Sequence, residues 1–187
     1  MVAPATSKGA PVTPDELLAS PLSSSWAFWV MSQQGKNAKE HWQANQMKTA
    51  EIASVGDFWR LSNNIHLASK LNVADYSLFR RGIAPAWEDP ACKNGGRWVA
   101  KITNRHDEAW LNVQLSLIGE AYHELGPVVC GAVFSARRGG TKVAIWLSTC
   151  DPDKVLAAGN LFKSILADDD IPFVFESFAH AGDSIKL

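Results

Sequence analysis

Residues 128–149 read VVCGAVFSARRGGTKVAIWLST, and this stretch decides the fold class. Its two halves, roughly 128–136 and 142–149, are rich in valine, isoleucine and aromatic residues, which favour β-strands. The Gly139-Gly140 pair between them is typical of a hairpin turn. Because a hairpin joins antiparallel neighbours, the stretch predicts an antiparallel sheet.

The rest of the chain adds strands and helices around this hairpin. Further strands are expected at roughly 25–32, 76–81, 97–103 and 172–178. Capping and periodicity signals predict three helices: from Ser54, with Asp57 as capping acid, to about Leu67; from about His106 to Tyr122; and from Asp151-Pro152 to about Leu166. An antiparallel sheet with helices on one face, an α+β fold, fits this order best.

Composition suggests one folded domain behind a tail. The chain has 187 residues, enough for a single substantial core. Residues 1–21 are rich in Ala, Pro, Ser and Thr, which predicts a flexible N-terminal tail before a domain at 22–187. Within this tail, Thr13-Pro14-Asp15-Glu16 is a capping pattern that predicts a short helical turn.

Charge and cysteine content limit the class of protein. The net charge is −1, whereas proteins that coat nucleic-acid backbone are normally basic, so a nucleic-acid ligand would have to be small and read locally. The three cysteines lack CxxC spacing and indicate reduced thiols, as in a cytoplasmic or nuclear protein. No signal-peptide pattern and no long apolar run occurs, so we expect no membrane contact. No metal-ligand, P-loop or nucleophile-elbow pattern occurs either; we therefore expect no enzyme activity, metal or cofactor.

Two tryptophans lie where core packing does not explain them. Trp42 is in the polar segment HWQAN, and Trp87 is in PAWEDP, which proline interrupts. An indole on a loop can stack on a flat ligand, and its face attracts cations. Glu88 beside Trp87 can accept two hydrogen bonds from a guanine edge. Together these residues suggest a slot for a positively charged purine; the alternative, for a loop tryptophan taken alone, is a partly buried anchor.

A series of short motifs supports this hypothesis. In order they are SWAFW at 25–29, HWQAN at 41–45, VGDFW at 55–59, DYSLF at 75–79, WED at 87–89, GGRW at 95–98, LIGE at 117–120, VCGAV at 129–133 and AIW at 144–146. In order and spacing, the sequence resembles the eukaryotic translation initiation factor 4E family over about 155 residues. The resemblance implies a curved antiparallel sheet with three helices on its convex face and a slot for the mRNA 5′ cap on its concave face.

The resemblance also implies roles for particular residues. Trp42 and Trp87 would sandwich the 7-methylguanine base, and Glu88 would accept its hydrogen bonds. Trp146 would lie near the methyl group, with core packing as the rival interpretation. Arg97, Arg137 and Lys142 would hold the cap phosphates; each could instead be a solvated surface charge.

A second surface is implied on the helices. A partner helix with the pattern Tyr, four residues, Leu and an apolar residue would bind there; 4G-type scaffold proteins and 4E-binding regulatory proteins carry it. The matching residues in this chain are Pro21, Val55, Trp59, Leu111, Leu115 and Ile118. We expect the protein itself to be a monomer.

Departures from the family pattern keep two alternatives open. Gly139 stands where family members often carry a lysine, and the C-terminal region is short. Ser20 and Asn112 differ from the residues that are frequent at the edge of the partner surface. The chain could therefore be a cap-binding paralogue that represses or stores mRNA, or a partner-binding module with weak cap affinity.

Overall fold

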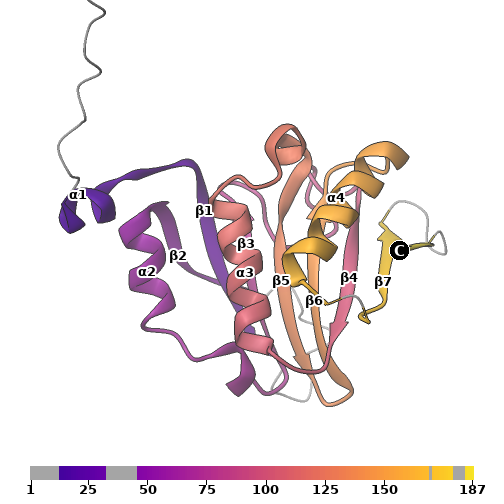
Figure 1. Ribbon diagram of the computed structural model, residues 1–187, viewed down its shortest axis with the longest axis horizontal. Helices are drawn as coiled ribbons and strands as arrows, with labels where there is room; N and C mark the ends of the chain where they lie inside the picture. Colours follow the sequence, from indigo (N-terminus) through magenta and orange to yellow (C-terminus); the bar gives the residue numbers. More distant parts are fainter. Residues whose placement is uncertain (1–12, 33–45, 169, 179–183) are drawn as a thin grey trace, which may run out of the picture.

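The computed structural model describes residues 13–32, 46–168, 170–178 and 184–187 (Figure 1). The elements are α1 (Pro14–Ala19), β1 (Pro21–Ser32), β2 (Gln46–Ser54), α2 (Val55–Ser62), the 3-10 turn η2 (Ala68–Lys70), β3 (Ala74–Arg80), β4 (Gly96–Ile102), α3 (His106–Ile118), η3 (His123–Val128), β5 (Val129–Arg137), β6 (Gly140–Leu147), α4 (Pro152–Leu166), β7 (Phe173–Ser177) and β8 (Ser184–Lys186). None of the described helices is long and apolar enough to cross a membrane.

The described strands form one sheet in the order β2-β1-β3-β5-β6-β4-β7-β8, and every neighbouring pair is antiparallel. The predicted β5–β6 hairpin is present near the middle of this sheet, but it turns at Arg138-Gly139, one residue before the predicted Gly139-Gly140 pair, because Gly140 already pairs with Arg137. Gly140 has a φ of +125°, a conformation that side chains with a Cβ rarely adopt. The predicted antiparallel α+β architecture is confirmed.

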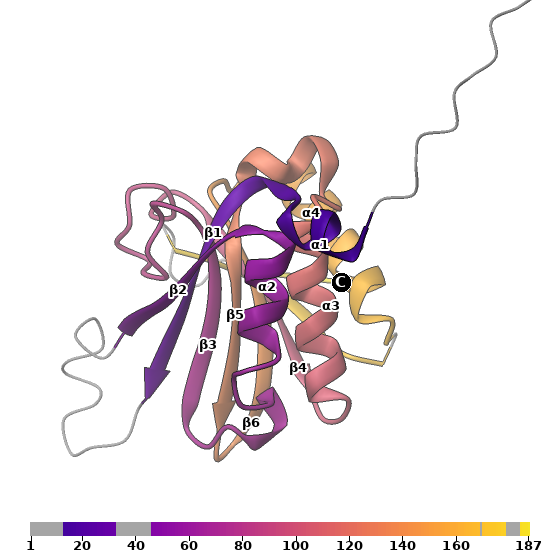
Figure 2. The same cartoon turned by 90° about the vertical axis from the view of Figure 1, so that its left-hand side faces the viewer.

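The helices α2, α3 and α4 cover one face of the curved sheet (Figure 2). Alternate strand residues face these helices, because successive side chains point to opposite sides of a strand. The core between the layers contains Trp26 and Trp98, both fully buried, with Trp110 of α3. Trp29 lies one residue out of phase with Trp26 and Phe28 and is only partly buried.

Local capping explains where the helices begin. At α2, the Ser54 hydroxyl accepts from Asp57 N (3.1 Å), and the Asp57 carboxylate accepts from Ser54 N (3.1 Å). At α4, Asp151 accepts from the amides of Asp153 and Lys154, and Pro152 occupies the first turn. Both starts agree with the sequence prediction.

Two helix ends come earlier than we predicted. The helix predicted to reach Leu67 ends at Ser62, because Asn64 Nδ2 donates to the Arg60 carbonyl (2.7 Å) and competes with the helical backbone. The helix predicted to reach Tyr122 ends at Ile118, where Gly119 caps it and Glu120 takes a φ of +52°.

The structure also adds elements that we did not expect as strands. β2 is an edge strand in which only Ile52 is buried, so its sequence lacks an alternating apolar signal. β8 is a short strand at the opposite edge. The described part of the predicted N-terminal tail contains α1, which packs against α2, so that segment is helical as its capping pattern suggested.

Candidate functional site

The candidate nucleotide site is on the face of the sheet that points away from the helices. On β4, Trp98 and Ala100 enter the core, so Arg97, Val99 and Lys101 point to the opposite face. The same alternation puts Trp146 and Lys142 of β6 on that face. The sequence-predicted residues Arg97, Trp146 and Lys142 therefore share one surface, as the resemblance implied.

The loop between β3 and β4, residues 81–95, lies on this same side of the sheet (Figure 2). Asp89 holds its bend, because its carboxylate accepts from Ala84 N and from Ala91 N, both at 2.9 Å. At one end of the loop, Cys92 is fully buried in a second apolar cluster together with Cys130 of β5. The hydrogen bond to Cys130 and burial both raise the pKa of the Cys92 thiol, so it remains a neutral packing group.

Trp87 and Glu88 are at the exposed part of this anchored loop. Trp87 is 54% exposed, and Glu88 is also exposed, with no hydrogen bond or ion pair to any residue that the structure describes. An exposed indole next to a carboxylate that has no such partner can bind a planar ligand with donor groups on one edge. Trp42 lies outside the described residues. The nearby Gln46 Nε2 nevertheless donates to the Pro85 carbonyl (2.8 Å), which ties the start of β2 to the Trp87 loop.

Trp146 has a different environment from Trp87. It is only 4% exposed and packs against Phe79 and Phe178, with ring centroids 5.4 and 4.6 Å away. Its indole N–H is buried and has no partner among the described residues. In this state Trp146 forms part of the second apolar cluster, so the packing role is present and the predicted contact with a methyl group stays a prediction.

Arg97 is held by a carboxylate that sequence reasoning missed. Its Nε donates a hydrogen bond to Glu176 Oε2 (2.9 Å), and its Nη2 forms an ion pair with the same oxygen at 2.8 Å; the two side chains are 40% and 42% exposed. Strand pairing brings them together, because Arg97 of β4 is directly opposite Glu176 of β7. The Arg97 guanidinium carbon also lies 6.0 Å from the Trp146 ring centroid, at the outer limit of a cation–π contact.

Arg137 is held more tightly. Its Nη2 donates to Asp75 Oδ2 (2.8 Å), and its Nη1 donates to the other Asp75 oxygen and to the carbonyls of Ala74 and Ala136. Asp75 is only 5% exposed, so this is a nearly buried carboxylate paired with a fixed guanidinium. Apart from the alternation of β3, nothing in the sequence indicates this pairing.

Lys142 is exposed and forms no ion pair within the described chain. Directly opposite it on β4 is Lys101, which is also exposed and unpaired there. Sequence reasoning overlooked Lys101, although its position two residues from Val99 and four from Arg97 indicates the same face.

The predicted partner surface lies on the helical side. Trp59 and Leu115 are each 37% exposed, so both side chains are accessible to a partner. Val55 and Leu111 are half-buried, and Pro21 is exposed at the start of β1. Ile118 differs, because it is 9% exposed and packs into the core. A hollow of about 240 Å³ adjoins Leu111 and is lined mainly by apolar atoms between α3 and the segment that follows α2.

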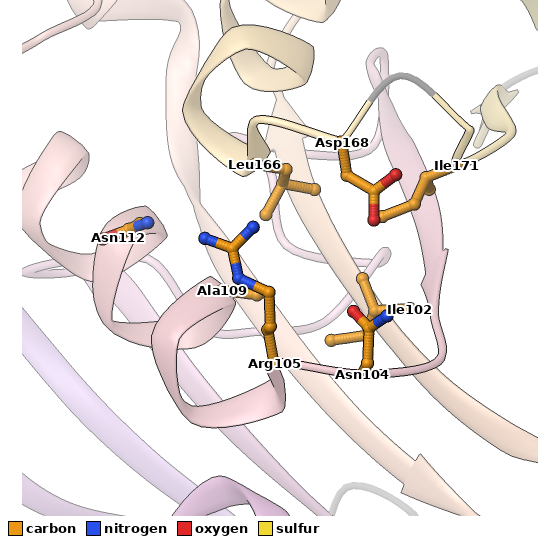
Figure 3. A pocket seen from close by; sticks show the side chains of 8 residues that line it. All are labelled: Ile102, Asn104, Arg105, Ala109, Asn112, Leu166, Asp168 and Ile171. Carbon is orange, nitrogen blue, oxygen red and sulfur yellow. The ribbon is translucent and has the colours of Figure 1, made fainter.

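Another hollow lies where α3 begins, bordered by Asn104, Arg105 and Asp168 (Figure 3). Its volume is about 10 Å³, which is room for about one water molecule. It cannot hold a nucleotide.

Comparison with known proteins agrees with this arrangement. Residues 21–184 match the family model described as eukaryotic initiation factor 4E. The chain is 40% identical over 163 residues to eukaryotic translation initiation factor 4E of Xenopus laevis, covering 83% of this chain and 75% of that protein. It is 39% identical over 169 residues to initiation factor 4E-1 of Hordeum vulgare subsp. vulgare, covering 88% and 78%.

Solved structures show the same relationship. The complex of C. elegans eIF4E-3 with the 4E-binding protein Mextli and a cap analogue aligns with a TM-score of 0.82 and 32% identity, over 89% of this chain and 99% of that one. Ascaris suum eIF4E-3 with the m2,2,7G cap aligns with a TM-score of 0.78 and 33% identity, over 89% and 94%. With the fold and the order of motifs in agreement, this chain belongs to the eukaryotic initiation factor 4E family.

Proposed function

We propose that this protein binds the 7-methylguanosine 5′ cap of mRNA and recruits a scaffold factor for translation initiation. The observation that carries the proposal is the exposed indole of Trp87 (54%), next to Glu88, whose carboxylate has no partner among the described residues. Both are on a loop that Cys92 anchors in the second apolar cluster. The anchors fix the loop before the ligand arrives, which lowers the entropy cost of binding. The structural relatives described with cap analogues, and the family membership, support the same ligand class.

Recognition would combine stacking and charge. Methylation at N7 gives guanine a delocalised positive charge, so an indole face attracts it in addition to stacking, with each stacked face worth about 1–3 kcal/mol. Trp42 would supply the second face. Glu88 would accept from the base N1–H and the exocyclic amine, which selects guanine over adenine. The positive charge would make the site bind 7-methylguanine more tightly than unmodified guanine.

The phosphates would lie along the strands, over Arg97, Arg137 and Lys142. An arginine presents several donors in a planar fork that suits phosphate oxygens, and lysine acts as a point charge. This is recognition without a chemical step, so we propose no enzymatic activity. We propose a cytoplasmic site of action, where capped mRNA enters translation, with nuclear residence also compatible with capped transcripts.

Partner recruitment would use the opposite side of the sheet. We place the partner surface on Trp59, Leu115, Val55 and Leu111 of α2 and α3, all exposed or half-buried, and the amphipathic helix of a 4G-type scaffold or a 4E-binding protein would lie across them. The complex of eIF4E-3 with Mextli and the schistosome eIF4E complex with 4E-BP are related structures that contain such partners. Because the two surfaces are on opposite faces, cap and scaffold could bind together.

The proposal is tested by titrating the intrinsic tryptophan fluorescence with 7-methyl-GTP and, as control, with GTP. We expect saturable quenching by 7-methyl-GTP that GTP does not reproduce. Trp87→Ala and Glu88→Gln should each weaken binding roughly 10- to 100-fold, the range expected for one stacked face or a charge-assisted pair, while circular dichroism stays unchanged. Equal quenching by both nucleotides, or full binding by Trp87→Ala, would contradict the proposed slot.

A further inference from the structure

Two lysines face each other on the concave side of the sheet. The β4–β6 register puts Lys101 directly opposite Lys142, and both are exposed. Like charges directly opposite in an antiparallel pair destabilise the sheet. Neither lysine forms an ion pair with any residue that the structure describes. The free protein therefore keeps an uncompensated double positive charge at this position.

The neighbouring acidic groups cannot neutralise these lysines without giving up other partners. On β3, the Asp75 carboxylate is already bonded to Arg137. On β7, Glu176 is bonded to Arg97, four residues along β4 from Lys101. The other charged group on the adjoining hairpin turn is Arg138, which is also positive and exposed. The surroundings of the lysine pair leave a local excess of positive charge.

Gly140 makes room for Lys101. A Cβ at position 140 would lie 3.1 Å from Lys101 Cε and 3.9 Å from its Nζ, so the Lys101 side chain runs close over the glycine backbone. The Lys101 side chain therefore runs toward the hairpin end of the sheet, where Gly140 pairs with Arg137. Along the strands, Lys101 and Lys142 lie four residues, roughly 13 Å, from Arg97 and Trp146.

We propose that Lys101 and Lys142 together bind a phosphate of the cap. This deepens the proposed function and rests on it. A negatively charged phosphate between the two ammonium groups removes their mutual repulsion and gains two charge-assisted hydrogen bonds. Lys101 thus adds a positive charge near the hairpin turn, where Gly139 stands in place of the lysine that family members often carry.

The experiment measures the affinities of Lys101→Gln for 7-methylguanosine, 7-methyl-GMP and 7-methyl-GTP by fluorescence titration at low and at high salt. We expect a roughly three- to tenfold loss for 7-methyl-GTP at low salt, a smaller loss at high salt, and no change for the nucleoside. Lys101→Arg should retain most of the affinity. The matched control is Lys70→Gln, which removes an exposed lysine in η2, on the helical side of the sheet and away from the face that carries Lys101.

Two further measurements separate a phosphate contact from a structural effect. In the free protein, Lys101→Gln should raise the melting temperature slightly, because it removes the repulsion from Lys142. In a double-mutant cycle with Lys142→Gln, the losses in 7-methyl-GTP affinity should be clearly non-additive, because both side chains serve one phosphate.

The outcomes distinguish the two proposals. If the wild type binds 7-methyl-GTP selectively and Lys101→Gln binds it equally well, the lysine-pair proposal is wrong and the cap proposal stands. If Lys101→Gln weakens the nucleoside as much as the triphosphate, the effect does not come from a phosphate and the lysine-pair proposal also fails. If the wild type does not distinguish 7-methyl-GTP from GTP, both proposals are overturned.

Discussion

Replacing Glu176 with glutamine should tighten the binding of 7-methyl-GTP. Glu176 holds Arg97 through a hydrogen bond of 2.9 Å and an ion-pair contact of 2.8 Å, and it adds a negative charge to the face where we place the phosphates. The substitution keeps the shape of the side chain and removes the charge. Arg97 would then be free to turn its guanidinium toward a phosphate.

The magnitude follows from exposure and geometry. Both side chains of the pair are about 40% exposed, and ion pairs with this exposure are worth at most about 1 kcal/mol. In Glu176→Gln this energy no longer has to be given up when Arg97 turns from residue 176 to a phosphate. A phosphate over β6 lies two strand spacings, roughly 10 Å, from a carboxylate on β7. At the dielectric constant of water, each unit of phosphate charge is then repelled by about 0.4 kcal/mol, which salt screens further. For one unit of phosphate charge the sum is at most about 1.4 kcal/mol at low ionic strength, or up to roughly tenfold in affinity.

The assay is fluorescence titration of the wild type and Glu176→Gln with 7-methyl-GTP and 7-methylguanosine over a salt series. The gain should be confined to the triphosphate and should shrink as salt rises. Glu108→Gln is the matched control, because Glu108 is also an exposed carboxylate paired with an arginine, but on α3. Unchanged or weaker binding of 7-methyl-GTP by Glu176→Gln would refute the placement of the phosphates beside Arg97.

Other substitutions test the remaining parts of the site. Gly139→Lys should strengthen 7-methyl-GTP binding roughly two- to fivefold at low salt, because a Cβ at this position meets no atom within 4 Å and the added charge lies at the phosphate end of the site. Gly139→Gln is the neutral control, and equal affinities of the two variants in fluorescence titration would count against the prediction. Trp59→Ala should lose a Tyr-x4-Leu peptide in calorimetry and keep 7-methyl-GTP, and loss of both ligands would show that the two surfaces are not separate. Asp57→Ala should destabilise the domain by about 0.3–1.5 kcal/mol in urea unfolding at pH 7, because it removes the capping box of α2. The Ser54 hydroxyl and the amide of Ala53 lower the pKa of Asp57 in the fold. Its contribution is therefore fully present above the unfolded pKa of about 4 and is lost as the pH falls from there through the lower folded pKa; a cost that persisted undiminished at pH 2 would argue against this origin.

Local signals explain which elements could be predicted from the sequence. The starts of α2 and α4 depend on side chains within three residues of the cap, so Ser54 and Asp151 mark them directly. The end of α2 is harder to predict, because it depends on whether the Asn64 side chain or a helical backbone amide bonds the Arg60 carbonyl. β2 was missed because an edge strand with one buried residue, Ile52, resembles a polar loop.

The candidate site divides in the same way. Trp87 and Glu88 are recognisable because they form an unusual polar segment by themselves. The partners of the arginines are not, since Asp75 is 62 residues from Arg137 and Glu176 is 79 residues from Arg97. These pairs exist only because of strand register, which composition and periodicity do not determine. The facing lysines at 101 and 142 were missed for the same reason.

The two arginines differ in how they are tied to the fold, and this difference separates stability from affinity. Arg137 pairs with the nearly buried Asp75 and two backbone carbonyls, so folding itself orients its guanidinium and a phosphate meets a prearranged donor. Loss of Arg137 would leave a buried carboxylate unpaired, so its cost falls on folding as well as on binding. Arg97 is half-exposed and its partner is exposed too, so changes there alter the charge that a ligand meets at little cost to the fold. Affinity for phosphate can therefore be adjusted at Arg97, Glu176 and Lys101 while Arg137 stays fixed.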